Sequence, residues 1–467
     1  MRTANIVRIA FHAALLTFLF VLPAFSQQRW ERTYGGTGSD WGYSVQQTSD
    51  GGYIVAGYTE SFGDSAQVYL IKTNASGDTL WTRTYGGVRN DYGYSVQQTQ
   101  DGGYIVAGWT TSFGNSEQVY LLKTNASGDT LWTRAFGGAS TDVGFSTQQT
   151  SEGGYIVAAW SLSFGNVGQV YLIKTNASGD SLWTRTYGGT NDDGGYSVQQ
   201  TLDNGYIVTG YTMSFGNVVQ VYLIKTNSGG DTLWTRNFGG AGNEFGYCVR
   251  QTSDTGYVVA GNTNSFGNGN QAYLIKTNAS GDTLWTRTYG GTGSEGASSV
   301  RQTSDLGFIV AGSTSSFGNG DQVYLVRTNA SGDTLWTRTF GGAGSDYGNS
   351  VQQTQDGGFA VAGWTSSFGN SQQVYLVKTD ANGNVGVEEK AVSSPVSRFP
   401  FSLRPNPFTS FATLPGHEAD RFSLYDLSGR RVGTYKGDRI GEGLAPGVYF
   451  LRPERGEAEP LRIVKVR

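Results

Sequence analysis

The chain has 467 residues, a net charge of −4 and only 15% charged side chains. This length predicts more than one domain, and the acidic balance disfavours a nucleic-acid-binding protein, which usually presents a basic face. The 70 glycines and the 13% of aromatic residues are typical of many short strands joined by tight turns, and they argue against a helical protein.

The first 26 residues have the pattern of a secretory signal peptide. Arg2 and Arg8 precede an apolar run over residues 9–22, which is too short to span a bilayer comfortably. Small residues follow and predict cleavage after Ser26. We therefore expect the mature chain to begin at Gln27 and to contain no transmembrane segment.

From Trp30 onward the sequence repeats one unit seven times. Such a fixed period is typical of propellers and solenoids. The second copy shows the unit, in which residues 80–85, 93–99, 104–110 and 118–124 have the pattern of strands, and no window has sustained helical periodicity. Four antiparallel strands in each unit predict an all-β fold, a seven-bladed β-propeller over residues 27–386, with an open solenoid as the alternative. The tryptophans that mark the repeat are 51 residues apart: Trp30, Trp81, Trp132, Trp183, Trp234, Trp285 and Trp336.

The ends of the repeat array indicate how the ring closes. Position 387, where an eighth tryptophan is expected, holds a valine, and the last copy supplies only three strands, at about residues 349–379. The strand around Trp30–Tyr34 is the missing fourth. A blade shared by both ends would latch the ring and remove both free sheet edges. The first and last copies are ordinary repeats, whereas a solenoid would need polar capping repeats.

The stretch Asn-Ala-Ser-Gly-Asp-Thr-Leu-Trp, found at residues 74–81, resembles the tryptophan motif of quinoprotein-like propellers. The resemblance covers residues 30 to about 386. It implies that each tryptophan strand is the outermost of its blade and that the chain then crosses to the innermost strand of the next. Residues 96–99 and their counterparts would line the central channel. The loops after Gly-Gly and the Ser-Phe-Gly-Asn loops would share the face at which propellers usually bind.

The sequence changes character after the repeats. Residues 387–399 are predicted to form a linker, and the alternating apolar runs in residues 400–467 predict a small antiparallel β-sandwich. The Pro-Asn-Pro-Phe segment at 405–408, the Tyr-Asp-x-x-Gly-Arg segment at 425–430, the Gly-Val-Tyr-Phe segment at 447–450 and the basic end resemble the type A C-terminal sorting domain of the bacterial type IX secretion system. This resemblance implies a Gram-negative bacterium of the Bacteroidetes type, the type IX machinery as a partner, and a secreted or outer-surface location.

The repeats contain no histidine, because His12 and His417 lie outside them. This excludes Ser-His-Asp and Cys-His catalysis and histidine-ligated metal sites in the repeat region. Cys248 is the single cysteine, so no intrachain disulfide can form, and it stands where the other six copies have serine. We expect a small, half-buried side chain with no basic group beside it to lower the pKa of the thiol.

Two series of acidic residues recur at the repeat spacing. The first lies beside glycine in a hairpin, and a role in the turn explains it: Asp50, Asp101, Glu152, Asp203, Asp254, Asp305 and Asp356. The second lies in the loop before each innermost strand and would form a ring around one channel mouth: Asp40, Asp91, Asp142, Asp193, Glu244, Glu295 and Asp346. This ring is either a cation or polyol site, with Ca²⁺ as the candidate ion, or seven local loop caps that accept backbone hydrogen bonds.

The residue after each acid of the second series varies, although the framework does not. Trp41, Tyr92, Phe245 and Tyr347 are aromatic, whereas Val143, Gly194 and Gly296 are not. Aromatic faces beside carboxylates suit sugar rings, and ordinary packing between loops is the alternative. We expect Trp41 and Tyr347 to lie on adjacent blades and to flank one sugar-sized site. The predicted ligand-binding residues are Asp40, Trp41, Asp91, Tyr92, Asp142, Asp193, Glu244, Phe245, Glu295, Asp346 and Tyr347.

These observations favour a secreted or cell-surface binding or adhesion propeller that recognises a glycan or another surface polymer. One alternative is a polysaccharide hydrolase, endoglucanase-like, that uses carboxylates on the propeller face. A quinoprotein-like dehydrogenase is disfavoured because the chain has seven predicted blades, highly regular repeats and one cysteine. An enzyme of any kind would need loops that break the repeat, and no insertion breaks the 51-residue spacing. A scaffold without a small ligand is a third possibility. No catalytic residue, metal ligand or cofactor is assigned. The Asn-Ala-Ser sequences are expected to be turns rather than glycan acceptors.

Overall fold

The computed structural model describes residues 29–386, 403–404, 406–426, 430–454 and 461–466. The predicted signal peptide, with its cleavage site after Ser26, and the predicted linker at 387–399 lie outside these residues. The chain divides into two compact units, Met1–Val387 and Glu388–Arg467. Within the described part, no helix has the length and apolar character that crossing a membrane requires.

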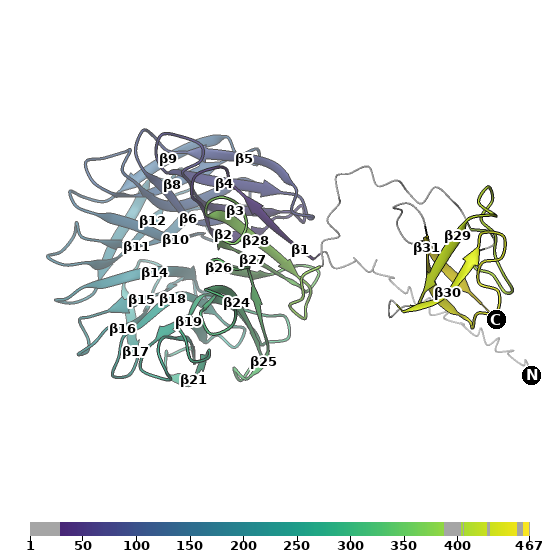
Figure 1. Ribbon diagram of the computed structural model, residues 1–467. Helices are drawn as coiled ribbons and strands as arrows, with labels where there is room; N and C mark the ends of the chain where they lie inside the picture. Colours follow the sequence, from purple (N-terminus) through teal and green to yellow (C-terminus); the bar gives the residue numbers. More distant parts are fainter. Residues whose placement is uncertain (1–28, 387–402, 405, 427–429, 455–460, 467) are drawn as a thin grey trace, which may run out of the picture. The chain divides into compact units, whose positions relative to one another are not determined.

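Residues 29–386 form seven four-stranded antiparallel sheets arranged as the blades of a ring (Figure 1). The predicted seven-bladed propeller is therefore confirmed. In each blade the chain runs from the innermost strand outward and then crosses to the next blade, and the tryptophan strand is outermost. We number the blades 1 to 7, from the blade of β2–β5 to the blade of β26–β28, which also contains β1.

The strands have nearly the same bounds in every blade. The innermost strands are β2 (Asp40–Gln47), β6 (Asp91–Gln98), β10 (Asp142–Gln149), β14 (Asp193–Gln200), β18 (Glu244–Gln251), β22 (Glu295–Gln302) and β26 (Asp346–Gln353). The second strands are β3 (Tyr53–Thr59), β7 (Tyr104–Thr110), β11 (Tyr155–Ser161), β15 (Tyr206–Thr212), β19 (Tyr257–Thr263), β23 (Phe308–Thr314) and β27 (Phe359–Thr365).

The outer half of each blade follows the same plan. The third strands are β4 (Gln67–Thr73), β8 (Gln118–Thr124), β12 (Gln169–Thr175), β16 (Gln220–Thr226), β20 (Gln271–Thr277), β24 (Gln322–Thr328) and β28 (Gln373–Thr379). The outermost strands are β5 (Thr79–Tyr85), β9 (Thr130–Phe136), β13 (Ser181–Tyr187), β17 (Thr232–Phe238), β21 (Thr283–Tyr289), β25 (Thr334–Phe340) and β1 (Trp30–Tyr34).

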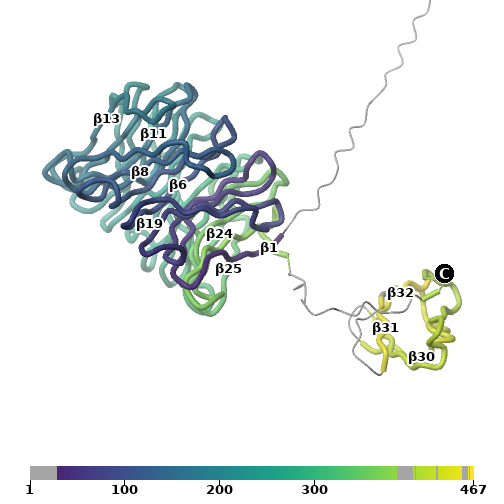
Figure 2. Tube along the Cα trace, turned by 90° about the horizontal axis from the view of Figure 1, so that it is seen from above, coloured from purple at the N-terminus to yellow at the C-terminus, as the bar shows by residue number. Residues whose placement is uncertain are grey.

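The two ends of the propeller share blade 7, as the sequence predicts. β1 pairs antiparallel with β28, from Trp30 opposite Lys378 to Tyr34 opposite Val374. In Figures 1 and 2, β1, in purple, lies beside the green end of the ring. The Trp30 ring also meets Tyr53 of blade 1 edge-to-face, with centroids 5.6 Å apart. The N-terminal strand is therefore held by the last blade and the first.

The blades are held together by packing between their faces. β3 and β4 are buried at every position because neighbouring blades cover both faces of the sheet. Each outer-strand tryptophan meets a tyrosine or phenylalanine of the next blade, as Trp81 meets Tyr104 with centroids 5.9 Å apart. An arginine lies over each of these tryptophans, and the guanidinium of Arg83 is 5.8 Å from the Trp81 ring. Each aromatic pair adds about 0.5–1.5 kcal/mol beyond its buried area.

The Asn-Ala-Ser-Gly-Asp segments are turns that receive these tryptophans. The side-chain oxygen of Asn74 accepts hydrogen bonds from the backbone N–H groups of Ser76 and Asp78, both at 2.9 Å. Gly77 has φ of +81°, and a Cβ there would lie 2.9 Å from the Trp30 ring. Glycine is therefore required both by the backbone conformation and by the close approach of the ring.

The C-terminal unit has its own core. Its strands β29 (Arg421–Tyr425), β30 (Arg431–Lys436), β31 (Gly447–Pro453) and β32 (Leu461–Lys465) form an antiparallel sheet in the order β30-β29-β31-β32. Leu403, Phe408 and Leu414 pack against Phe422 and Leu424 of β29. The sequence predicted a β-sandwich, but the described residues of this unit form one sheet. The segment that contains Phe408 and Leu414 packs on this sheet and pairs only through isolated bridges.

Candidate ligand-binding site

The second acidic series is buried at the first position of each innermost strand, and not in the loop before the strand where the sequence placed it. Asp40 Oδ2 accepts hydrogen bonds from the Gly36 N–H, at 2.8 Å, and from the Ser61 hydroxyl, at 2.6 Å. Glu244 in blade 5 is enclosed in the same way by the Gly240 N–H, at 3.0 Å, and the Thr263 hydroxyl, at 2.8 Å. The seven side chains are at most 2% exposed: Asp40, Asp91, Asp142, Asp193, Glu244, Glu295 and Asp346.

These hydrogen bonds match the local-cap interpretation of the second series and not a solvent-facing ring of carboxylates. Of the two alternatives for the ring, the contacts fit the local caps: each acid accepts a hydrogen bond from an N–H of the Gly-Gly loop, and in six of the seven blades a serine hydroxyl after the second strand also donates to it. Among the described residues, no group of three or more His, Cys, Asp or Glu lies close enough together to hold a metal ion. Because the acids are buried, the side chains that can contact a ligand at this end are the residues beside them in the sequence, such as Trp41.

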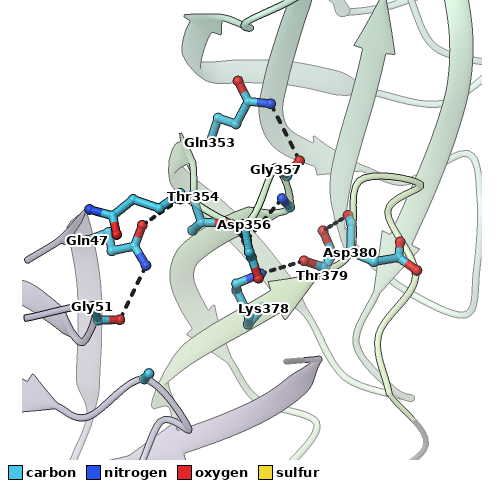
Figure 3. Close-up of polar contacts among 12 residues, drawn as sticks. Gln47, Gly51, Gln353, Thr354, Asp356, Gly357, Lys378, Thr379 and Asp380 are labelled. Atoms are coloured by element: carbon cyan, nitrogen blue, oxygen red, sulfur yellow. Dashed lines mark hydrogen bonds and ion pairs between the residues drawn. The ribbon is translucent and has the colours of Figure 1, made fainter. Parts of the chain in front are cut away.

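The first acidic series lies at the opposite ends of the innermost strands and pairs with buried lysines. Lys72 Nζ is 2.9 Å from Asp50 Oδ2, and the lysine side chain is 5% exposed whereas the aspartate is 55% exposed. Figure 3 shows the same ion pair in blade 7, where Lys378 points at Asp356. Beside it, the Gln47 amide of blade 1 donates a hydrogen bond to the Gly51 carbonyl of its own hairpin turn. The sequence predicted the turn but not the ion pair. The signal was present, because a basic residue recurs at the repeat spacing: Arg327 in blade 6 and a lysine in each other blade.

These ion pairs change the acidity of the first series. Burial opposes ionisation of Asp50, but hydrogen bonds from Lys72, the Thr48 hydroxyl and the Gly52 N–H outweigh it and lower the pKa of the carboxyl. The same balance, with Lys174 as the cation, lowers the pKa of Glu152 to about 2. The first series therefore stabilises the hairpins as ionised groups.

Aromatic side chains near the second series form one continuous row. Neighbouring rings have centroids between 4.5 and 6.4 Å apart. The row runs from blade 7 through blades 1, 2, 3 and 4 to blade 5. We call it the aromatic arc, and its members are Tyr347, Trp364, Trp41, Tyr43, Tyr58, Tyr92, Tyr94, Trp109, Phe145, Tyr196, Tyr211, Phe245 and Tyr247.

Trp41 and Tyr347 lie on adjacent blades, and a third ring lies between them. Trp364 stacks on Trp41 at 4.5 Å and on Tyr347 at 4.6 Å. No space for a sugar is left between the two predicted residues, so a ligand would have to lie along the row of three rings. The sequence analysis missed Trp364 because it belongs to the second strand of its blade.

Two more columns of the repeat supply the rest of the arc. The innermost strand bulges between Gly42 and Ser44, so that Tyr43 falls outside the regular pairing. Tyr58 of the second strand lies opposite Trp41 in the pairing of β2 with β3. Aligning the seven copies at these two columns, in addition to the column of Trp41, would have identified the arc from the sequence.

Blade 6 interrupts the arc. In the three aromatic columns it carries Gly296, Ser298 and Ser313. Asn349 follows in blade 7 and donates a hydrogen bond from its amide to the Gly42 carbonyl at 2.8 Å. The arc is therefore open on one side, and its two ends are separated by small and polar residues.

Polar groups lie along the edge of the arc. The Tyr347 hydroxyl donates to Asp321 Oδ2 at 2.6 Å, and Trp41 Nε1 donates to the Gln372 side-chain oxygen at 2.8 Å. The Tyr211 hydroxyl donates to Asp192 in the same way. Burial, together with the Asp321 carboxylate, raises the pKa of Tyr347 to about 12. The site thus combines uncharged aromatic faces with carboxylate and amide edges.

The middle of the channel has a different lining. Of residues 96–99, which were predicted to line it, Val96 and Gln97 do so, whereas Gln98 and Thr99 line a depression on the hairpin side. A cavity of about 210 Å³ is lined by serine, threonine, valine and glutamine residues and by Arg250 and Arg301. The expectation that no basic group adjoins Cys248 is wrong, because Arg301 Nη1 is 3.6 Å from its sulfur. Burial raises the pKa of this thiol, but the charges of Arg250 and Arg301 outweigh burial and lower it. The side chain is also buried, at 5% exposed.

Comparison with known proteins supports the fold. The family described as "Domain of unknown function (DUF5122) beta-propeller" matches residues 99–130. No curated protein matches the chain.

Several solved structures are similar to the chain at low identity. A protein of unknown function from Bacteroides caccae is 11% identical, with a TM-score of 0.41, over 65% of this chain and 94% of that one. Sqt1 from Chaetomium thermophilum is 10% identical, with a TM-score of 0.44, over 93% and 100%. The periplasmic gluconolactonase of Pseudomonas aeruginosa is 14% identical, with a TM-score of 0.45, over 65% and 87%. With the sheet order described above, the family match makes the chain a β-propeller repeat protein.

Proposed function

We propose that the protein is a secreted or surface-attached binding propeller that recognises a glycan or another surface polymer through the aromatic arc. The observation that carries this proposal is the continuity of the arc over six of the seven blades. Repeated aromatic faces match a polymer with repeated rings better than a single small molecule. Ten of the thirteen arc residues, Trp41, Tyr92 and Phe245 among them, are half-buried, so the arc is partly open to solvent.

The edge groups of the arc fit the hydroxyls of a sugar. Asp321 and Asp192 already accept hydrogen bonds from phenols of the arc, and their carboxylates can accept further ones. A phenol with a pKa of about 12, such as that of Tyr347, is protonated at neutral pH and carries no charge. Few polar groups around a largely apolar surface are typical of sites that fix a ligand's orientation. The arrangement therefore supports a neutral or weakly charged glycan.

The proposal includes export by the type IX secretion system of a Gram-negative bacterium. It is supported by the four sequence segments of the C-terminal unit and by the compact core of that unit. Removing residues 400–467 should leave a folded propeller in the periplasm, as measured by fractionation and immunoblotting. Efficient appearance of the truncated chain at the cell surface or in the medium would contradict the proposed route.

The binding proposal is tested by changing arc residues in the full chain. A polymer and glycan screen identifies a ligand, and the double variant Trp41→Ala/Tyr347→Ala is then titrated with it. Both side chains stack on Trp364, so we expect a loss of about 1–3 kcal/mol of folding stability and at least about tenfold weaker binding. Circular dichroism verifies that the variant is folded at the temperature of the assay.

A matched control separates binding from general packing loss. Phe113 is an aromatic residue that is 41% exposed, lies in a Ser-Phe-Gly-Asn loop outside the arc and contacts Tyr120 at 5.6 Å. Phe113→Ala should leave the affinity unchanged. Equal affinities in the wild type and the double variant would show that the arc only packs. Hydrolysis of each polymer is measured in the same samples, because a hydrolase is the alternative function.

A further inference from the structure

Blades 5 and 6 break a ring of glutamines in the middle of the channel. Five blades place a glutamine at the same position of the innermost strand, and blades 5 and 6 place Arg250 and Arg301 there. All seven side chains line the cavity of about 210 Å³: Gln46, Gln97, Gln148, Gln199, Arg250, Arg301 and Gln352.

The glutamines have a structural task that the arginines cannot perform. The side-chain oxygen of Gln97 accepts the backbone N–H of Gln149 in the next blade at 2.6 Å, and Gln199 accepts that of Gln251 at 2.7 Å. A guanidinium group has no hydrogen-bond acceptor. Arg250 and Arg301 therefore give up two of the bonds that tie neighbouring blades together around the channel, which suggests that the charges serve another purpose.

The two guanidinium groups have no carboxylate partner in the described part of the chain. Arg250 Nη1 donates to the Val249 carbonyl at 2.8 Å. Arg301 Nη1 donates to the Val300 carbonyl at 2.9 Å and lies 3.6 Å from Cys248 Sγ. No Asp or Glu is among the described residues that line the cavity. Burial and the neighbouring charge of Arg250 lower the pKa of Arg301 to about 10. Enclosing two like charges side by side is unfavourable unless an anion accompanies them.

We propose that this cavity binds a small oxyanion of phosphate or sulfate size between Arg250 and Arg301. The planar fork of an arginine matches the oxygens of such an anion, and each guanidinium retains donors that the backbone carbonyls do not use. The cavity volume of about 210 Å³ is enough for an oxyanion with a few waters. This site does not depend on the proposed glycan binding.

The anion would enter from the hairpin side, away from the aromatic arc. Gln148 and Gln199 line both the cavity and a depression that includes Ser151 and Thr201 of the hairpin turns. Gln46 and Gln97 share the cavity with a second depression, next to Ser49 and Gln100. These shared lining residues place the cavity next to the surface at which the innermost strands end.

Calorimetric titration of the full chain with sodium phosphate and, separately, sodium sulfate tests the proposal. The double variant Arg250→Gln/Arg301→Gln installs the residue of the other five blades, so it should fold and regain both hydrogen bonds between blades. We expect saturable binding in the wild type and at least about tenfold weaker binding in the double variant. The single variants Arg250→Gln and Arg301→Gln should each fall in between.

Cys248→Ser is the matched control, because it installs the serine of the other six blades and keeps both arginines. It should bind the anion like the wild type. Wild-type protein without saturable binding of either anion up to about 10 mM, or a double variant that binds as tightly as the wild type, would overturn the proposal. The proposal is supported if the anion binds to the wild type and raises its melting temperature but does neither for the double variant.

Discussion

The two ends of the seven innermost strands differ in how strictly they repeat. At the hairpin end every blade has an acid, a tight turn and a buried cation, as in Asp50 with Lys72. At the other end every blade keeps its buried acid cap, but the residues beside it range from Trp41 to Gly296. Repetition at the hairpins maintains the ring. Variation beside the caps is what a binding surface on a fixed scaffold would show.

The largest expected effect comes from opening the ring. Deleting residues 27–36 removes β1, leaves β28 as a free edge and takes the Trp30 ring away from Tyr53. We expect loss of cooperative folding, because both ends of the propeller lose their partner. Thermal melts followed by circular dichroism measure this, and a deletion variant that melts as sharply as the parent would contradict the latch.

The second largest effect is expected from acid, which should lower the stability that the first acidic series contributes at the hairpin end. The pKa values of the first series are lower in the folded state than in the unfolded state, so the stability they contribute is complete above the unfolded pKa and is lost as the pH falls through the folded pKa. For Glu152 this window runs from 4.5 down to about 2. Urea unfolding at pH values from 7 to 2 should show the decline. Glu152→Gln should make it shallower, and an unchanged slope would exclude this carboxylate as a contributor.

Breaking one hairpin pair should cost less than opening the ring, and the two partners should not be equivalent. Asp101→Ala leaves the ammonium of Lys123, which is 3% exposed, without its carboxylate. We expect a loss of about 1–3 kcal/mol. Lys123→Met should cost less, since the remaining aspartate is 57% exposed and can be hydrated. Urea titrations compare the two variants, and the reverse order would be incompatible with a buried lysine.

The smallest effect on stability is expected where the aromatic arc is interrupted. A Cβ at Gly296 meets no atom within 4 Å. Gly296→Tyr should therefore change the stability by no more than about 0.5 kcal/mol and, by extending the arc, strengthen polymer binding about two- to tenfold. Gly194→Tyr is the contrasting variant, because its Cβ would lie 2.4 Å from the Tyr211 ring. It should destabilise the protein by about 1–3 kcal/mol, and equal stabilities would show that the arc packs loosely.

Much of the fold could be predicted, and less of the site. The 51-residue period and the missing eighth tryptophan predicted the blade number, the strand order and the closing strand. The acids were predicted in the right columns, but whether a carboxylate faces solvent depends on the Gly-Gly loop that encloses it. The stacking of Trp364 between Trp41 and Tyr347 requires three strands of two blades to meet, which no local pattern indicates.

The sequence by itself determined the repeat, the antiparallel blades and the latch, because a four-stranded unit that cannot bury its own faces must stack on copies of itself. Only the tertiary structure decided which repeated side chains are enclosed and which meet. Ring closure brings Trp41 against Trp364, and the common channel brings Arg250 and Arg301 into one cavity. These contacts join residues of different blades, so they follow from the curvature of the ring and not from any single copy of the repeat.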